Sequence, residues 1–275
     1  MLPSKLQSSA SLKMSESAKS RSLPSLALLA GGLATRLRPV TATIPKSMLR
    51  VGGEPFVAHQ LRLLRDQGIR QVVLCVGHLG EQLRDFVGDG SAYGLAVQYS
   101  FDGPVLKGTG GAIKQALPLL GDHFLIMYGD SYLPTSFALV YERFAESGAE
   151  GLMTVFHNGN RWDKSNVEFG EGRIVRYDKS HPDASMEYID YGLGILRAEA
   201  FDSWESEDTF DLARVYESLV ARGQLAGYEV KERFFEIGSH EGLAEADTSL
   251  FHQVKNLYSP TGSHPELTDE PGGHS

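Results

Sequence analysis

Residues 28–49 read LLAGGLATRLRPVTATIPKSML and combine an apolar run, a glycine turn and fixed cations. The apolar run predicts a strand that ends at Gly31 and Gly32, and Arg36 and Lys46 follow it. A polyphosphate needs close backbone N–H groups, which glycines can bring near it, and cations that offset its charge. A guanidinium can hold phosphate through two hydrogen bonds, whereas an ammonium acts as a point charge. The stretch therefore predicts a site for a nucleoside triphosphate.

An ordinary strand-to-loop turn with solvated cations would explain a lone pair of glycines. The extension Thr-Arg-Leu-Arg-Pro and the later Pro-Lys pair favour the nucleotide site instead. The chain has no G-x-x-x-x-G-K-S/T pattern, and these glycines are not spaced as G-x-G-x-x-G. The sequence therefore predicts neither a P-loop nor a dinucleotide-binding site.

Composition places the chain among soluble globular proteins, with 275 residues, 41% hydrophobic and 22% charged. A formal charge of -9 argues against nonspecific binding to nucleic acid, which needs a basic face. No apolar stretch reaches the length of a membrane span, so we expect no membrane partner. The single cysteine, Cys75, lies in an apolar run, which predicts a core position and fits a reducing cytoplasm.

Alternating β-type runs and amphipathic helical patterns predict a mainly parallel α/β sheet with helices on both faces. Expected strands cover residues 26–30, 71–76, 96–99 and 124–128, and expected helices cover 56–67, 79–86 and 109–117. After residue 150 the pattern is richer in strands, at 152–156, 166–169, 174–177, 191–196 and 225–230, with helices at 210–222 and 241–255. Gly170-Glu171-Gly172 predicts an antiparallel hairpin. Residues 1–24 and 258–275 are expected to be disordered.

A second signal is the buried-strand pattern FLIMYGDS at residues 124–131, whose end presents Asp130. Ligands of open α/β sheets bind beyond the carboxyl ends of the strands, where Gly31, Gly77 and Gly129 also fall. A carboxylate beside a phosphate loop is placed to hold Mg²⁺, a hard cation that prefers oxygen ligands. Asp130 alternatively starts a turn or caps the helix that follows Pro134.

At these residues the chain resembles the nucleotide-sugar pyrophosphorylases, also called sugar-1-phosphate nucleotidyltransferases. Their pattern is an Ala-Gly-Gly turn, Thr-Arg-Leu, a Pro-Lys pair and a later Gly-Asp at the metal. Ala34 stands where glycine is common in the family, and Ser47 stands where proline is common. The resemblance covers about residues 25–255 and implies one catalytic domain, 25–257, with a Rossmann-like three-layer mixed sheet of the GT-A-like type. A small β-rich portion would bind the sugar.

The resemblance assigns nucleotide binding to the glycine turn and to a second glycine-rich segment, where small residues admit a flat base: Ala30, Gly31, Gly32, Thr35, Gly108, Thr109 and Gly110. Without the family, Thr109 is equally well explained as an ordinary helix cap. The family's second metal ligand is an aspartate in a late Asp-x-Gly pattern. Glu236 occupies that position here, with Asp130 as the first ligand of Mg²⁺. Glu236 alternatively only caps the next helix.

The family also carries an acid-Lys-Pro motif after a hairpin, which Asp178-Lys179-Ser180 resembles without its proline. Lys179 would neutralise the sugar phosphate, although a lysine in a polar loop is usually only solvated. The implied sugar contacts are Asp178, Asp190, Gly192, Asn166 and Glu168.

The implied reaction joins an NTP to a sugar 1-phosphate and releases pyrophosphate, with catalysis by Arg36, Lys46 and Lys179. No protein nucleophile is needed, because the sugar phosphate attacks the α-phosphorus in line. Segments 108–116 and 227–238 look most like the enzymes that use GTP with heptose or mannose 1-phosphate, and UTP or dTTP are the alternatives. A monomer or small homo-oligomer is expected. The rivals are a non-catalytic nucleotide-sugar sensor and a glycosyltransferase, although Asp130-Ser131-Tyr132 lacks the Asp-x-Asp motif of the latter.

Overall fold

The computed structural model describes residues 23–161 and 164–257. The expected disorder of residues 1–22 and 258–275 lies outside these ranges. Leu23 and Pro24 belong to the segment expected to be disordered but are among the described residues, and Leu23 packs against the hydrophobic core.

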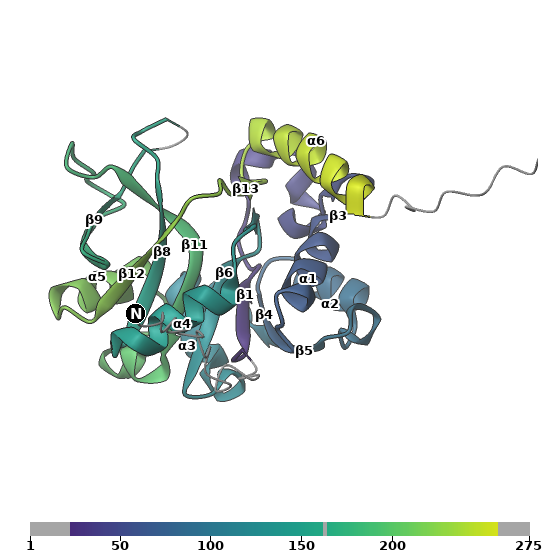
Figure 1. The fold of residues 1–275 in the computed structure, drawn as a ribbon. Helices are drawn as coiled ribbons and strands as arrows, with labels where there is room; N and C mark the ends of the chain where they lie inside the picture. Colours follow the sequence, from purple (N-terminus) through teal and green to yellow (C-terminus); the bar gives the residue numbers. More distant parts are fainter. Residues whose placement is uncertain (1–22, 162–163, 258–275) are drawn as a thin grey trace, which may run out of the picture.

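A nine-stranded mixed sheet runs through the molecule in the order β5-β4-β1-β6-β11-β8-β12-β10-β9 (Figure 1). The first four strands are parallel: β5 (Ala96–Phe101), β4 (Gln71–Val76), β1 (Leu26–Leu29) and β6 (His123–Tyr128). The others are β11 (Tyr188–Arg197), β8 (Gly151–His157), β12 (Leu225–Val230), β10 (Arg173–Tyr177) and β9 (Val167–Gly170). Among these five strands of the second half, only β8 and β12 pair in parallel. The expected mainly parallel sheet is therefore confirmed for the first half alone.

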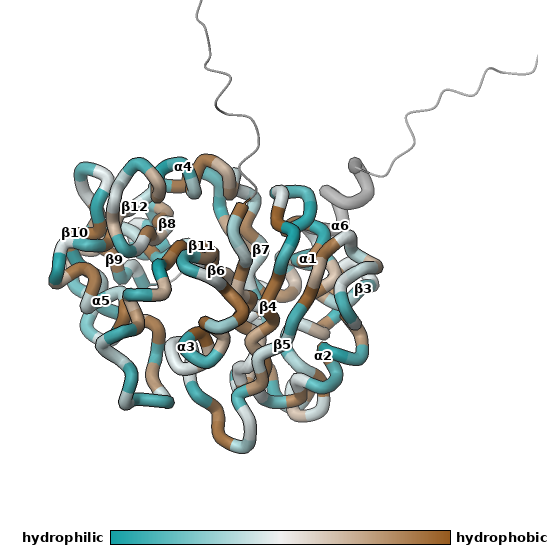
Figure 2. The backbone as a smooth tube through the Cα atoms, turned by 90° about the horizontal axis from the view of Figure 1, so that it is seen from below, coloured by the Kyte–Doolittle hydropathy of each residue, from teal (hydrophilic) through white to brown (hydrophobic). Residues whose placement is uncertain are grey.

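β1, β4 and β6 are buried on both faces, and their side chains alternate between two hydrophobic clusters. Leu26 and Leu28 of β1 join one cluster, whereas Ala27 between them joins the other. The first cluster packs against α1 (Phe56–Asp66), α2 (Gly80–Val87) and α4 (Phe137–Ser147). The second packs against α3 (Gly108–Leu120) and α5 (Ala213–Ala221). This arrangement confirms the three-layer α/β fold, and Figure 2 shows the hydrophobic course of β4 and β6 within it.

A third cluster lies beyond the carboxyl end of the sheet and fixes the chain around the first motif. Leu37, Val51 and Phe56 pack there against Ile237 and Ala246. Leu37 ends the 3₁₀ turn Thr35–Leu37 that follows β1. The other residues belong to or flank α6 (His240–Leu257) and two small ladders, β2 (Arg50–Val51) with β3 (Glu54–Pro55) and β7 (Ser131–Tyr132) with β13 (Phe235–Glu236). Figure 1 shows α6 lying across this end, above α1 and β3. The late part of the chain thereby returns to the loop that follows β1.

Two expected elements differ from those observed. The helix expected at 210–222 begins only at Ala213, because residues 208–212 form a loop that covers the start of α3. Asn166, expected inside a strand, precedes β9. The hairpin at Gly170–Gly172 is confirmed by the pairing of Gly170 with Arg173. Among the described helices, none is long and apolar enough to cross a membrane.

Candidate active site

The loops that leave β1, β4 and β6 approach one another backbone to backbone, and glycines make this possible. A Cβ atom on Gly31 would lie 2.9 Å from the backbone nitrogen of Gly77. One on Gly77 would lie 2.8 Å from the Gly31 carbonyl oxygen, and one on Gly129 would lie 2.8 Å from that of Leu29. The three predicted strand ends therefore meet at one edge of the sheet, where open α/β sheets bind ligands.

This crowding predicts opposite outcomes for two neighbouring substitutions. Gly31→Ala forces the Gly77 backbone to move and is expected to cost about 1–3 kcal/mol of unfolding free energy. Gly32→Ala is the matched control, because a Cβ there meets nothing within 4 Å. Urea unfolding of the two variants measures the difference. Equal stabilities would show that the loops do not need this close approach.

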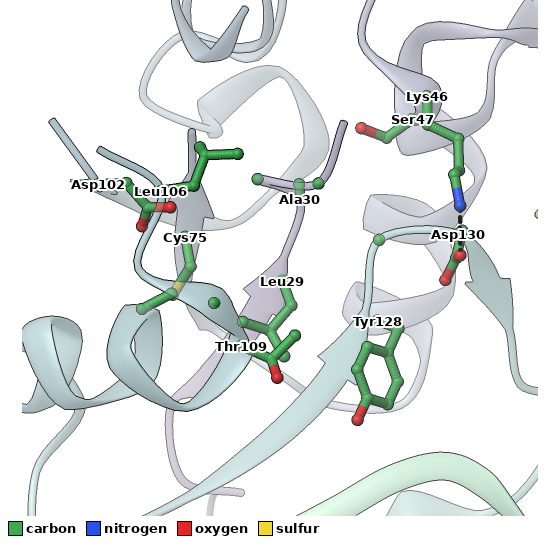
Figure 3. Close-up of a pocket in the computed structure, with 15 residues that line it drawn as sticks. Leu29, Ala30, Lys46, Ser47, Cys75, Asp102, Leu106, Thr109, Tyr128 and Asp130 are labelled. Carbon is green, nitrogen blue, oxygen red and sulfur yellow. Dashed lines mark hydrogen bonds and ion pairs between the residues drawn. The ribbon is translucent and has the colours of Figure 1, made fainter. Parts of the chain in front are cut away.

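A cavity of about 250 Å³ opens at this edge (Figure 3). Its walls come from the ends of β1, β4, β5 and β6 and from the start of α3. The lining residues are Leu29, Ala30, Gly31, Gly32, Lys46, Ser47, Cys75, Asp102, Leu106, Gly108, Thr109, Ala112, Tyr128, Gly129 and Asp130. The structure thus brings five of the seven predicted nucleotide-binding residues to one cavity, and Thr35 and Gly110 are outside its lining.

The chain after β1 offers backbone donors at the cavity. In the described ranges, the N–H groups of Gly31, Gly32 and Leu33 have no acceptor in the protein. Such successive amides form the kind of concave site that binds anions. Ala34 then adopts a left-handed conformation with φ 47°, which costs a residue with a Cβ about 1 kcal/mol. This conformation explains why glycine suits the position, and the Thr41 hydroxyl holds the turn by donating to the Ala34 carbonyl at 2.8 Å.

Lys46 and Asp130 form an ion pair across the mouth of the cavity. The Lys46 Nζ lies 2.8 Å from Asp130 Oδ2, and the two side chains are 20% and 27% exposed (Figure 3). Lys46 opens a short 3₁₀ turn whose next residue, Ser47, is buried, so the lysine is held on a fixed backbone. Partial exposure leaves both groups within reach of a ligand.

Glu236 lies beside Asp130, as the resemblance implies. Glu236 pairs with Ser131 in the β13–β7 ladder, and the Ile237 N–H donates to the Asp130 carbonyl at 2.9 Å. Burial raises the pKa of the Glu236 carboxyl, and the nearby charge of Asp130 raises it further. The positive charge of Arg36 lowers the pKa of Glu236, so the Arg36 guanidinium lies close to this carboxyl.

The pair of carboxylates fits a divalent cation. A carboxyl whose pKa is raised by burial and by a neighbouring carboxylate gains from a hard cation between the two. The described residues contain no group of three or more acidic, His or Cys side chains suited to a metal. A cation here would therefore take further oxygen ligands from a bound phosphate, as Mg²⁺ commonly does.

The glycine-rich start of α3 divides into two faces. Gly108, Thr109 and Ala112 line the cavity. A Cβ on Gly110 would lie 2.4 Å from the Phe210 ring, and the Gly110 N–H donates to the Phe210 carbonyl at 2.9 Å. Gly110 therefore admits the loop before α5 and lies outside the cavity lining. Thr109 does not cap its own helix, because its hydroxyl oxygen accepts the Leu212 N–H at 2.8 Å.

Lys179 lies beside the rings of Tyr128 and Tyr177. Its Nζ lies 5.8 Å from the centre of the Tyr128 ring and 5.9 Å from that of Tyr177, within cation–π range. It also lies 4.0 Å from Asp211 Oδ1. Since Tyr128 lines the cavity, Lys179 stands next to it, with its ammonium partly open to solvent.

Asp190, Asn166 and Gly192 form a polar group next to Lys179. The Asn166 Oδ1 accepts the Asp190 N–H at 3.1 Å, and Asp190 Oδ1 accepts the Gly192 N–H at 3.0 Å. Burial raises the pKa of the Asp190 carboxyl, and the charge of Lys179 partly offsets this. Gly192 has φ 99°, and a Cβ there would lie 3.5 Å from the Tyr128 ring and 3.6 Å from Ser131 Oγ. The group therefore lies beside the end of β6.

The carboxylates of Asp178 and Glu168 do not join the polar group of Asp190, Asn166 and Gly192. The Asp178 Oδ1 accepts the backbone N–H groups of Ser180 and His181, both at 2.8 Å, and the His181 bond holds the pKa of Asp178 low. The Asp178 backbone still reaches the group, since its N–H donates to the Asn166 carbonyl at 3.0 Å. The Glu168 carboxylate lies 3.2 Å from the Ser185 hydroxyl, which has a shorter contact of 2.7 Å with Asp183 Oδ1. Among the described residues no contact joins the Glu168 carboxylate to Asp190.

Sequence patterns missed Asp102 and Tyr128 as lining residues. Asp102 follows β5 directly, so the strand-end rule that found Asp130 also indicated it. The sequence pattern places Tyr128 only at the end of a buried strand. Cys75 is buried as predicted, and burial raises the pKa of its thiol to about 12, although it also touches the cavity.

Comparison with known protein families gives a match that covers most of the chain. The model of the nucleotidyl transferase family matches residues 27–253. N-acetylmuramate alpha-1-phosphate uridylyltransferase of Neisseria meningitidis serogroup B is 31% identical over 225 residues, which are 80% of this chain and 95% of the relative. D-glycero-alpha-D-manno-heptose 1-phosphate guanylyltransferase of Campylobacter jejuni is 26% identical over 218 residues, 78% of this chain and 94% of the relative.

Solved structures share the fold. HddC of Yersinia pseudotuberculosis, crystallised with GMP-PN, superposes with a TM-score of 0.67 at 23% identity, over 83% of this chain and 100% of that one. At this identity the likeness supports the fold alone. Together with the sheet order, it confirms the GT-A-like nucleotidyltransferase type of α/β fold.

Proposed function

The chain belongs to the nucleotidyl transferase family, and we propose that it transfers a nucleotidyl group from an NTP to a sugar 1-phosphate. A phosphate oxygen of the sugar 1-phosphate bonds to the α-phosphorus, and the bond from that phosphorus to the β-phosphate bridging oxygen breaks. The products are an NDP-sugar and pyrophosphate. The observation that carries this proposal is the cavity at the strand ends, where a glycine turn, Lys46 and two carboxylates lie together.

The phosphate side is assigned to the chain after β1. The amides of Gly31 and Gly32 and the guanidinium of Arg36 would hold the β- and γ-phosphates that leave, because negative charge grows there during transfer. Lys46 would bridge phosphate oxygens near the reacting phosphorus. In exchange it would give up part of its contact with Asp130, which the partial exposure of both side chains permits.

Mg²⁺ is the cofactor that the donor set fits, with Asp130 and Glu236 as its protein ligands. When bound, it would supply Lewis-acid stabilisation of the charge on the phosphate oxygens. The residues themselves orient the triphosphate, and no protein nucleophile is required, because positioning and charge neutralisation carry phosphoryl-type transfer.

The acceptor side is assigned to the group around Lys179. The Lys179 ammonium would neutralise the sugar phosphate, while Asp190 and the Gly192 backbone would contact sugar hydroxyls. Asn166 would act through Asp190, whose backbone it already binds. Asp178 serves here through its backbone position, and Glu168 is left out of the sugar site because its carboxylate has no contact with Asp190 among the described residues.

Lys179→Met is expected to raise KM for the sugar 1-phosphate by roughly 10- to 100-fold, the worth of a hydrogen bond to a charged group. NTP binding should be unchanged, because Lys179 is outside the cavity lining. Steady-state kinetics and a nucleotide titration measure the two quantities. Lys231→Met, at an exposed lysine paired with Glu229, is the control. Loss of NTP affinity with an unchanged sugar KM would contradict the assignment.

The names of the relatives differ in both base and sugar. The NTP and the sugar 1-phosphate that this chain uses therefore have to be identified with a panel of substrates. GTP with heptose or mannose 1-phosphate is the pair we favour. Pyrophosphate release is measured for four NTPs, each with several sugar 1-phosphates and Mg²⁺. Turnover with at least one pair supports the proposal. Nucleotide binding without turnover for any pair would overturn it and favour a non-catalytic sensor.

A further inference from the structure

Gln60 is a buried glutamine of α1 that the phosphate, metal and sugar roles above leave unused. It is fully buried in a helix whose other buried positions are mostly apolar. Burial of an amide group costs free energy unless its polar atoms are hydrogen-bonded. The role of this glutamine therefore depends on what its amide group binds.

The Gln60 amide binds the backbone on both sides of Asp130. Its Nε2 donates to the Tyr128 carbonyl at 3.0 Å and to the Ser131 carbonyl at 2.7 Å. Both partners are acceptors, so only the nitrogen can face them, and the orientation of the amide is fixed. The turn at residues 129–130 lies between the two carbonyls. One side chain thus holds both ends of the turn that presents the Asp130 carboxylate.

This orientation leaves the Gln60 Oε1 without a donor in the described part of the chain, although the atom is buried. A buried acceptor without a partner costs free energy. A methionine has a similar length and would avoid that cost, because it carries no strong hydrogen-bonding group. Packing therefore does not explain the amide, and its contribution is the pair of hydrogen bonds that it donates.

Two backbone hydrogen bonds reach the same turn from other elements. The Gly129 N–H donates to the Leu29 carbonyl, and the Ile237 N–H donates to the Asp130 carbonyl, both at 2.9 Å. These bonds bind groups inside the turn, whereas Gln60 binds the carbonyls before and after it. Loss of the Gln60 amide should therefore let the turn rotate while the sheet stays intact.

The same helix also holds the segment that carries Lys46. The Phe56 N–H at the start of α1 donates to the Leu49 carbonyl at 2.9 Å. Leu49 directly follows the 3₁₀ turn that Lys46 opens. α1 therefore connects the two partners of the ion pair, and Gln60 makes its contact on the Asp130 side.

Few other contacts fix the direction of the Asp130 carboxylate. Its Oδ2 lies 2.8 Å from Lys46 Nζ, and its Oδ1 accepts only a long hydrogen bond of 3.4 Å from the Ser131 hydroxyl. In the proposed reaction Lys46 gives up part of its contact to phosphate, so the carboxylate then depends on the turn at residues 129–130. A displacement on the order of 1 Å at a reacting centre can cost about 100-fold in rate.

We propose that Gln60 is a positioning residue for the reaction: its amide sets the direction in which Asp130 presents its carboxylate to the metal and the triphosphate. The inference rests on the proposed function for the identity of the ligand, an NTP with Mg²⁺. It deepens that function by naming a residue that acts through Asp130 and touches neither substrate.

The test compares NTP binding with and without Mg²⁺, and it requires no turnover. The probe is the NTP that the wild type binds most tightly among GTP, UTP, dTTP and ATP, titrated against the full chain with Mg²⁺ and again with EDTA. Gln60→Met should weaken binding about 10-fold with Mg²⁺, the usual cost of losing a group that orients a metal ligand, and should leave binding in EDTA unchanged. Added to Asp130→Asn, which already lacks the metal ligand, it should cost no further affinity.

Gln67→Met is the matched control. Gln67 follows the last residue of the same helix, and its Oε1 accepts the Phe137 N–H at 3.1 Å. This variant also removes a contact between a glutamine and the backbone, but it does so away from Asp130. It should leave NTP affinity unchanged both with Mg²⁺ and in EDTA.

Three results would overturn the inference: equal losses with Mg²⁺ and in EDTA for Gln60→Met, unchanged affinity in both, or a further loss when it is added to Asp130→Asn. If Gln60→Met does not fold, the ¹⁵N resonance of the Gln60 side-chain amide in the wild type decides. It should shift when Mg²⁺ is added to the NTP-bound protein, while the Gln67 resonance stays in place, and an unshifted Gln60 resonance would overturn the inference. The expected effects on binding, with no turnover for any substrate pair, would overturn the proposed function alone.

Discussion

Asp130→Asn is expected to lower kcat roughly 1,000-fold while the protein stays folded. The substitution keeps the shape of the side chain but removes the charge that pairs with Lys46 at 2.8 Å and that would hold Mg²⁺. Several kcal/mol of charge stabilisation in the transition state correspond to this factor. Lys46, the charge that loses its partner, is 20% exposed, so solvent can still reach its ammonium. Single-turnover kinetics with the preferred substrates measure the loss.

Asp122→Asn provides the control for this prediction, because Asp122 precedes the same strand at its opposite end and is exposed. It should retain wild-type turnover. A second readout is Mg²⁺ dependence, which should shift to higher concentrations in Asp130→Asn and stay unchanged in the control. Near-normal kcat in Asp130→Asn would remove Asp130 from the reacting centre.

Lys46→Met is expected to lower kcat roughly 100- to 1,000-fold, the range found when one fixed donor to a developing charge is removed. The methionine retains the aliphatic length of lysine and loses only the ammonium. Because the 3₁₀ turn at Lys46–Met48 is held by its own backbone and by buried Ser47, the loop should keep its course. Rapid-quench measurement of NDP-sugar formation gives the rate.

The double variant separates two roles for Lys46. If Lys46 only orients Asp130, then Lys46→Met should cost nothing further once Asp130 is asparagine. If Lys46 itself contacts phosphate, as we propose, the double variant should be slower than either single variant. A double variant as active as Asp130→Asn would reduce Lys46 to a positioning residue.

Local patterns predicted the first half of the sheet well, because its strands are continuous apolar runs closed by glycines. Residues 71–76, for example, match β4 residue for residue. The contacts of Gly31, Gly77 and Gly129 follow from the rule that parallel strands end at one edge. The two-residue ladder of β7 and β13 had no such signal, since it depends on a long return of the chain.

The predicted site residues also divide into those whose position follows from a local motif and those whose position depends on a distant segment of the chain. Asp130 and Lys46 stand in motifs close to strand ends, and the structure brings them into an ion pair. Gly110 was read as a residue that admits a base, whereas its contact is Phe210, one hundred residues later. The strand pattern places Glu168 on the face of the sugar group, yet its carboxylate lies near Ser185 and has no contact with Asp190 among the described residues. The surroundings of Gly110 and Glu168 depend on contacts between segments far apart in the sequence. The periodicity of apolar residues carries no information about such contacts.

Transfer of a label from sugar 1-phosphate to product tests the central claim most directly. The sugar 1-phosphate is prepared with ¹⁸O in its phosphate and incubated with the chain, Mg²⁺ and the preferred NTP, and the products are analysed by mass spectrometry. Direct attack on the α-phosphorus predicts an NDP-sugar that carries the full label and pyrophosphate that carries none. Labelled pyrophosphate, or nucleotide binding with no NDP-sugar from any substrate pair, would contradict the account.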